Sequence, residues 1–182
     1  MRVAAELGWR EAAGARDKST LRDALRRRPG GEDDWQRLQA LVYGERIGEA
    51  PPFAGARACI AQLAAAGAAV FVVSHKTRTA AAAPGGPDLH AAARAWLEQH
   101  GFIGAAMIRP ESVFFEPTRA AKVERLRTLA VATAIDDLPE VLGDAAFPAH
   151  VQGWLFAPLG AADGPWPTFP SWFAIARALG FP

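Results

Sequence analysis

The feature that most constrains the fold is a fully apolar run at residues 70–73 that ends directly in Ser74. The alanine-rich stretch 56–66 precedes it and predicts a helix, which Gly67 stops. A continuous apolar run of this length is typical of a parallel strand that is buried on both faces, because a half-exposed antiparallel strand alternates apolar and polar residues. The run therefore indicates an α/β architecture.

The same alternation of helix and strand continues from Phe53 to the end of the chain. Asp88 is expected to cap one helix and Ser171 the last one, where the aromatic side chains of 166–172 pack the helix on the sheet. Helix–strand alternation implies right-handed crossovers and a parallel sheet with helices on both faces. The expected strands are 69–73, 113–115, 132–135 and 152–156, and the expected helices are 89–100, the stretch containing Lys122, 139–142 and 172–179.

Residues 1–50 differ from the rest of the chain, because their pattern predicts helices and no strand. Expected helices cover 20–28, with Ser19 or Thr20 as the cap, and 33–47, with Asp33 as the cap. Pro51-Pro52 then breaks the pattern. The sequence therefore predicts a helical segment at 1–50 and an α/β core at 51–182, within a single domain.

Composition excludes several classes of function. The formal net charge of +1 gives no indication that the chain binds nucleic acid or an acidic membrane surface. No run reaches the ~18 apolar residues of a membrane span. The single cysteine, Cys59, excludes an internal disulfide and fits a reducing compartment, and its apolar neighbours favour inert packing in the core. We expect a cytoplasmic globular protein.

Polar residues with complementary chemistry follow the expected strands in a fixed order. Ser74 comes first, then Lys122 in a helix, then the acidic pair Asp136-Asp137. Ligands of parallel sheets collect at the carboxyl ends of the strands. A hydroxyl can hydrogen-bond a phosphate oxygen, an ammonium group can neutralise the transferring phosphoryl group, and carboxylates can hold Mg²⁺. The order indicates a site for Mg²⁺-assisted phosphoryl transfer.

Each of these residues also has a plainer interpretation. Ser74 could be a turn or helix-cap serine, Lys122 a solvated helix residue, and one of the two aspartates the cap of the following helix. Adjacent like charges are unfavourable without a cation or a cap, so the acidic pair is the stronger signal. The conjunction in this order supports the phosphoryl-transfer interpretation.

Four segments together resemble the haloacid dehalogenase (HAD)-like hydrolases: 72–77, 88–97, 113–119 and 135–138. The resemblance implies a Rossmannoid parallel sheet with flanking helices, and a small helical cap made by the first 50 residues. It also implies that Ser74 and Lys122 are catalytic and that Asp136 and Asp137 bind Mg²⁺. The resemblance makes four further residues candidates for substrate contacts, with a polar loop as the alternative interpretation of the first three: His75, Lys76, Thr77 and Arg119.

One part of the family pattern is missing. The first motif, Asp-x-Asp at the end of the first central strand, does not occur, and the earliest aspartate, Asp17, follows no strand. We therefore expect a truncated chain without the first central strand, inactive as given. Two hypotheses remain: a Mg²⁺-dependent phosphatase acting on a small phosphorylated metabolite, or a non-catalytic phosphate- and Mg²⁺-binding module or degenerate pseudoenzyme. Neither involves nucleic acid or membrane partners, and the sequence makes no prediction of the oligomeric state.

Overall fold

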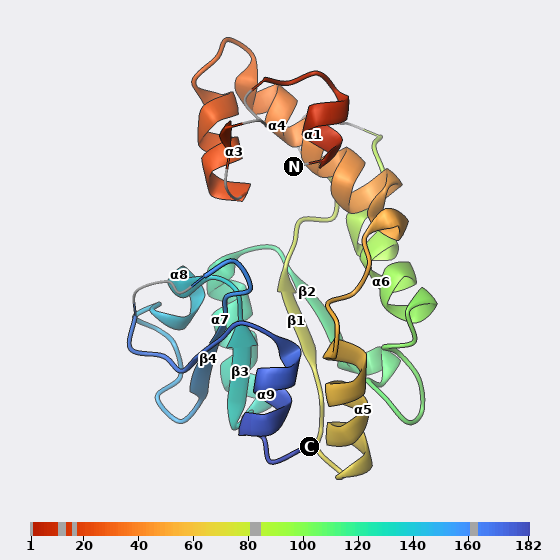
Figure 1. Cartoon of the computed structure of the whole chain (residues 1–182), viewed down its shortest axis with the longest axis vertical. Coiled ribbons are helices and arrows are strands. Elements are labelled where there is room, and N and C mark those ends of the chain that lie inside the picture. Colours follow the sequence, from red (N-terminus) through yellow and green to blue (C-terminus); the bar gives the residue numbers. More distant parts are fainter. Residues whose placement is uncertain (1, 11–13, 16–17, 81–84, 161–163) are drawn as a thin grey trace. The chain divides into compact units, whose positions relative to one another are not determined.

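The computed structural model describes residues 2–10, 14–15, 18–80, 85–160 and 164–182 (Figure 1). They form a mixed α/β structure of two compact units. The first unit combines Met1–Ala50 with Arg78–Trp96, and the second combines Pro51–Thr77 with Leu97–Pro182. The structure thus groups 78–96, which the sequence analysis assigned to the core, with the first 50 residues. Among the described residues no helix is long and apolar enough to cross a membrane.

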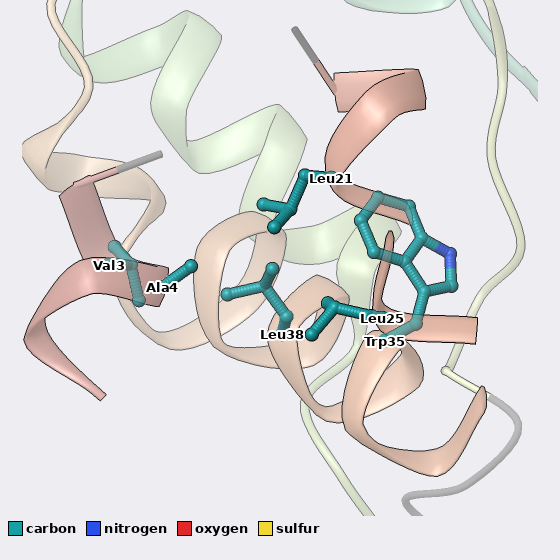
Figure 2. Packing of buried hydrophobic residues seen from close by; sticks show 6 residues of the cluster. All are labelled: Val3, Ala4, Leu21, Leu25, Trp35 and Leu38. Carbon is teal, nitrogen blue, oxygen red and sulfur yellow. The ribbon is translucent and has the colours of Figure 1, made fainter. Parts of the chain in front are cut away.

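The first unit is helical. It contains helices α1, α3 and α4, a π-helical segment η1, a 3₁₀ segment η2 and most of α6. Figure 2 shows its core, six apolar side chains that α1, α3 and α4 contribute. The core residues are Val3, Ala4, Leu21, Leu25, Trp35 and Leu38. The bounds of these segments are α1 (Arg2–Glu6), α3 (Lys18–Arg26), α4 (Gly31–Ala40), η1 (Leu41–Glu45), η2 (Ile47–Glu49) and α6 (Leu89–Gln99).

Two of the expected helix caps in this unit are wrong. Helix α3 begins at Lys18, so Ser19 and Thr20 both lie inside it. Helix α4 begins at Gly31 behind Gly30, whose φ of 70° is in the left-handed region that glycine adopts without strain. Asp33 therefore lies in the first turn, where its carboxylate is favoured by the positive end of the helix dipole. The turn at Gly30 therefore lets α4 begin at Gly31, before the position that a cap by Asp33 would require.

The cap of α6 agrees with the sequence. The Oδ1 atom of Asp88 accepts hydrogen bonds from the backbone N–H groups of His90 and Ala91, both at 2.9 Å. Beyond the helix, Gly101 has a φ of 68°, as expected of a residue that ends a helix.

The second unit contains all the strands of the described chain. Helix α8 and strand β4 have the bounds that the sequence predicted. Strand β1 begins three residues later than the expected 69–73 and extends past Ser74 to His75. The two-residue strand β5 was not expected. The elements in chain order are α5 (Ala56–Ala65), β1 (Val72–His75), η3 (Pro110–Ser112), β2 (Val113–Glu116), α7 (Arg119–Leu129), β3 (Thr133–Asp136), α8 (Pro139–Leu142), β4 (Gln152–Phe156), β5 (Thr168–Phe169) and α9 (Trp172–Ala178).

The strands form two parallel sheets, where the sequence analysis expected one parallel sheet without its first central strand. One sheet pairs β1 with β2, with Val72 opposite Val113 and His75 opposite Glu116. The other has the order β3-β4-β5. Within the described residues no strand joins β1 to β3, so each of them has one unpaired edge (Figure 1).

Helix α9 packs on β4 as expected. The Ser171 hydroxyl accepts a hydrogen bond from the Ala174 N–H at 3.2 Å and caps the helix. Ile175 of α9 is fully buried with Trp154 of β4 and with Cys59 of α5. Burial raises the pKa of the Cys59 thiol, so the side chain stays a neutral core residue, as the sequence predicted.

Replacing Gly31 with alanine should destabilise the first unit. A Cβ at this position would lie 1.8 Å from the backbone oxygen of Leu25, and a backbone atom cannot move aside cheaply. We expect Gly31→Ala to lower the free energy of unfolding by about 1–3 kcal/mol or more in urea denaturation followed by circular dichroism. Gly14→Ala is the control, because no atom of the described residues lies within 4 Å of its added Cβ. Equal stability of the two variants would contradict this packing.

Candidate functional site

A buried ion pair lies at the carboxyl end of β3. The ammonium group of Lys122 on α7 contacts the Oδ2 atom of Asp136, and their side chains are only 13% and 4% exposed. The Oδ1 atom of Asp136 accepts a hydrogen bond from the Leu138 N–H at 3.1 Å. Both carboxylate oxygens therefore have a partner. Lys122 is therefore not the solvated helix residue of the alternative interpretation. The other alternative holds in part, because Asp136 bonds the N–H of Leu138 directly before α8, although Leu138 itself makes no side-chain cap bond.

The local sequence positions Lys122 on the sheet side of its helix. The Thr118 hydroxyl caps α7 by accepting a hydrogen bond from the Ala121 N–H at 3.0 Å. Residues four apart share a helix face, so Lys122 and Leu126 point the same way. Leu126 packs on Ala134, while Lys122 reaches Asp136 two residues further along β3. Helix α7 therefore runs antiparallel to β3.

The same helix defines the direction of the other sheet. Helix α7 follows β2 directly and packs back against both β1 and β2. Since α7 also runs opposite to β3, the strands of both sheets point the same way. The carboxyl ends of β1, β2 and β3 consequently carry the residues Ser74-His75, Glu116 and Asp136 on one side of the unit. This is the side on which parallel sheets bind ligands.

Ser74 and Lys122 approach this region from opposite faces. Val73 packs toward Leu126, and Phe114, its partner on β2, lies 4.6 Å from the Arg125 guanidinium. These side chains face α7. Because side chains alternate along a strand, Ser74 faces the other side and His75 faces α7 again. The hydroxyl of Ser74 and the ammonium of Lys122 can therefore meet one ligand only beyond the strand ends.

The remaining predicted residues lie more openly. His75, Thr77 and Asp137 are exposed. Lys76 is half-buried, and its backbone N–H donates to the Glu116 carbonyl at 2.9 Å, which extends the β1–β2 ladder.

Arg119 is exposed and pairs with a carboxylate outside the predicted set. Its Nε atom lies 3.3 Å from the Oδ2 atom of Asp144. The earliest aspartate, Asp17, lies outside the described residues.

The sequence analysis missed a second acid at this edge. Glu116 ends β2 as Asp136 ends β3, and its side chain is 13% exposed. Its Oε1 atom accepts a hydrogen bond from the Nε atom of Arg125 at 2.7 Å. The signal was present, because an acidic residue directly after an apolar run was the pattern that identified Asp136.

Burial raises the pKa of the Asp136 carboxyl above its ordinary value of 3.8, and the Lys122 ammonium opposes this shift without cancelling it. The folded chain therefore takes up this proton at a higher pH than the unfolded chain. The free-energy cost of the buried charge is present above the folded pKa and disappears as the pH falls through it.

Few carboxylates are available for a metal ion. Among the described residues no three or more His, Cys, Asp and Glu side chains converge on one point. Mg²⁺ keeps several waters and takes one or two carboxylates, so the neighbours Asp136 and Asp137 are compatible with it. Each oxygen of Asp136 keeps a lone pair beyond its present partner.

The chain matches no protein-family model, no curated protein and no solved structure. Membership of the HAD-like hydrolases therefore stays a prediction from the motifs quoted above.

Removing the lysine of the buried pair should have a pH-dependent cost. We expect Lys122→Met to lower the free energy of unfolding by about 3–5 kcal/mol at neutral pH, because it leaves a buried carboxylate without its cation. The loss should shrink in mildly acidic buffer, where Asp136 can take up a proton. Urea denaturation at the two pH values measures both effects.

Two further variants test whether the charge of Asp136 causes the loss of stability. Adding Asp136→Asn to Lys122→Met should recover most of the lost stability at neutral pH, since no charge then stays buried. Arg177→Met removes an exposed cation of the same unit and should change stability little at either pH. An equal loss for Lys122→Met at both pH values would show that the charge of Asp136 is not the cause.

Proposed function

We propose that this chain is the core of a HAD-like hydrolase, a Mg²⁺-dependent phosphatase of a small phosphorylated metabolite. The observation that supports it best is the buried contact of Lys122 with Asp136. A lysine from the helix after one strand reaches the carboxylate that ends the next strand. A cation and an anion held in this way at the ligand-binding edge suit a phosphoryl group and its metal ion.

Lys122 would bind the phosphoryl group. An ammonium group has three N–H donors, of which Asp136 uses one, so the others can meet phosphoryl oxygens. Because its side chain is only 13% exposed, water screens the charge weakly and its attraction to a phosphoryl group is stronger. Ser74 would add one hydrogen bond from the opposite face of the sheet layer.

Asp136 and Asp137 would hold Mg²⁺ together with water. When bound, the ion neutralises phosphate charge and orients the group under attack. Asp136 is held by Lys122 and the Leu138 N–H, whereas Asp137 is exposed and can turn toward a ligand. The exposed residues His75, Thr77 and Arg119 would contact the rest of a small substrate, with the half-buried Lys76 beside them.

One observation favours a second candidate, a phosphate- and Mg²⁺-binding module without turnover. The 182 residues contain no Asp-x-Asp, so the sequence supplies no counterpart of the nucleophile and its acid/base partner in the HAD-like pattern. Both candidates predict binding at the same residues and no turnover by the 182 residues alone, so turnover after an Asp-x-Asp strand is added separates them.

Mg²⁺ and inorganic phosphate added together should stabilise the chain against thermal unfolding. At a ligand concentration about a hundredfold above Kd the gain is about 2.7 kcal/mol. Asp137→Asn should abolish it, because the variant removes a metal ligand. Glu140→Gln is the matched control, an exposed acid three residues away that should keep the gain. Differential scanning fluorimetry, with Ca²⁺ and sulfate as comparison ions, measures these shifts.

The outcome separates the candidates. Stabilisation that Asp137→Asn removes, with hydrolysis of small phosphoesters once a strand ending in Asp-x-Asp is added at the N-terminus, supports the phosphatase. The same stabilisation without hydrolysis by that extended chain supports the binding module. An unfolding temperature that neither ion changes, or a gain that Asp137→Asn retains, would overturn both.

A further inference from the structure

Each basic residue of helix α7 forms an ion pair with an acidic residue. The acids come from the ends of β2 and β3, from the loop after α8 and from α7 itself. The pairs are Arg119 with Asp144, Lys122 with Asp136, Arg125 with Glu116, and Arg127 with Glu124. Since α7 lies wholly within the described residues, none of its basic residues is left without an acidic partner.

Arg119 is the basic residue of α7 that lies furthest beyond the strand ends. It precedes Lys122 by three residues, so the two side chains are neighbours on the surface of the helix. Because α7 runs antiparallel to β3, the turn that carries Arg119 extends past the carboxyl end of this strand. A ligand whose phosphoryl group meets Lys122 would therefore place its other end near Arg119.

Asp144 holds the guanidinium group of Arg119 from the loop after α8. Its Oδ2 atom lies 3.3 Å from the Nε atom of Arg119, and its Oδ1 atom accepts a hydrogen bond from the Ala146 N–H at 3.0 Å. The Asp144 side chain is 20% exposed and that of Arg119 is 51% exposed, so the carboxylate is the better fixed partner. Its charge offsets that of Arg119 where a ligand would meet the guanidinium group.

Leu138 gives the same edge an uncharged surface. It follows Asp137 directly, its N–H donates to Asp136, and its side chain is exposed. Ligand sites combine apolar side chains with a few polar groups that fix orientation. An uncharged part of a ligand can pack on Leu138, whereas a charged part would lose water there without gaining a partner.

We propose that Asp144 determines the substrate class of the site: by neutralising Arg119 it restricts the site to phosphomonoesters whose remainder carries no negative charge. Mg²⁺ balances the charge of the phosphoryl group. A further carboxylate would meet the exposed Asp137 and a guanidinium group that is already paired. The inference rests on the proposed function, because it takes Lys122 and Asp136 as the place where the phosphoryl group and Mg²⁺ bind. Asp144 is a positioning residue that acts through Arg119.

The test compares two ligands that differ in one charged group. Glycerol phosphate and phosphoglycerate, each phosphorylated at a terminal oxygen, carry a hydroxymethyl group and a carboxylate at the other end. Isothermal titration calorimetry of the full chain in excess Mg²⁺ measures both dissociation constants. No turnover is expected of the 182 residues alone, so both ligands stay intact. We expect phosphoglycerate to bind at least about tenfold more weakly, because one unfavourable charge near a protein surface costs roughly this factor.

Asp144→Asn should shift this preference toward phosphoglycerate. Asparagine keeps the oxygen that accepts the Ala146 N–H but loses the charge, which releases Arg119 for a carboxylate. We expect the ratio of the two dissociation constants to change by about tenfold. A variant that only loosened the fold would weaken both ligands alike and leave the ratio unchanged.

Glu124→Gln is the matched control. It releases Arg127, which lies on the same helix about two turns further from the strand ends, and should not change the ratio.

Three results would overturn this inference alone, provided that inorganic phosphate binds in the presence of Mg²⁺. The first is a wild-type chain that binds phosphoglycerate as tightly as glycerol phosphate. The second is an unchanged ratio in Asp144→Asn. The third is an equal change in Glu124→Gln, which would mean that the net charge of α7 decides and not Asp144. If neither inorganic phosphate nor either ester binds, the proposed function fails together with the inference.

Discussion

The contact of the Lys122 ammonium with the Asp136 carboxylate connects the parts of the second unit on which its site depends. Helix α7 packs against β1 and β2, and this ion pair attaches the same helix to the end of β3. A buried pair adds little net stability, because desolvation of both charges offsets their attraction, yet removal of one partner is costly. The main effect of the pair is therefore to fix the positions of α7 and the end of β3, and not to stabilise the fold. It holds a cation and an anion at the edge where parallel sheets bind ligands.

The two sheets share this helix. Leu126, one turn after Lys122, packs with Ala134 and near Val73. The ion pair and this apolar contact together hold α7 against β1 and β3, the strands that carry Ser74 and Asp136.

Sequence patterns succeeded where the signal was local. Asp88 and Ser171 cap their helices as expected, because a short polar side chain ahead of a helix bonds the N–H groups two or three residues later. Asp33 failed as a cap because Gly30, with its positive φ, had already turned the chain into α4. The two-residue strand β5 was missed, since its existence depends on pairing with β4 and not on any pattern of its own.

By itself the sequence determined the alternation of helix and strand after Phe53, the spacing that puts Lys122 and Leu126 on one helix face, and the acid that ends the apolar run at Asp136. These follow from dihedral preferences and side-chain periodicity, which act over a few residues. Only the tertiary structure decided that Lys122 is buried against Asp136, that Ser74 faces away from it, and that β5 pairs with β4. Those outcomes depend on which distant segments pack together, and the free energy of such contacts is not encoded in any single window of the chain.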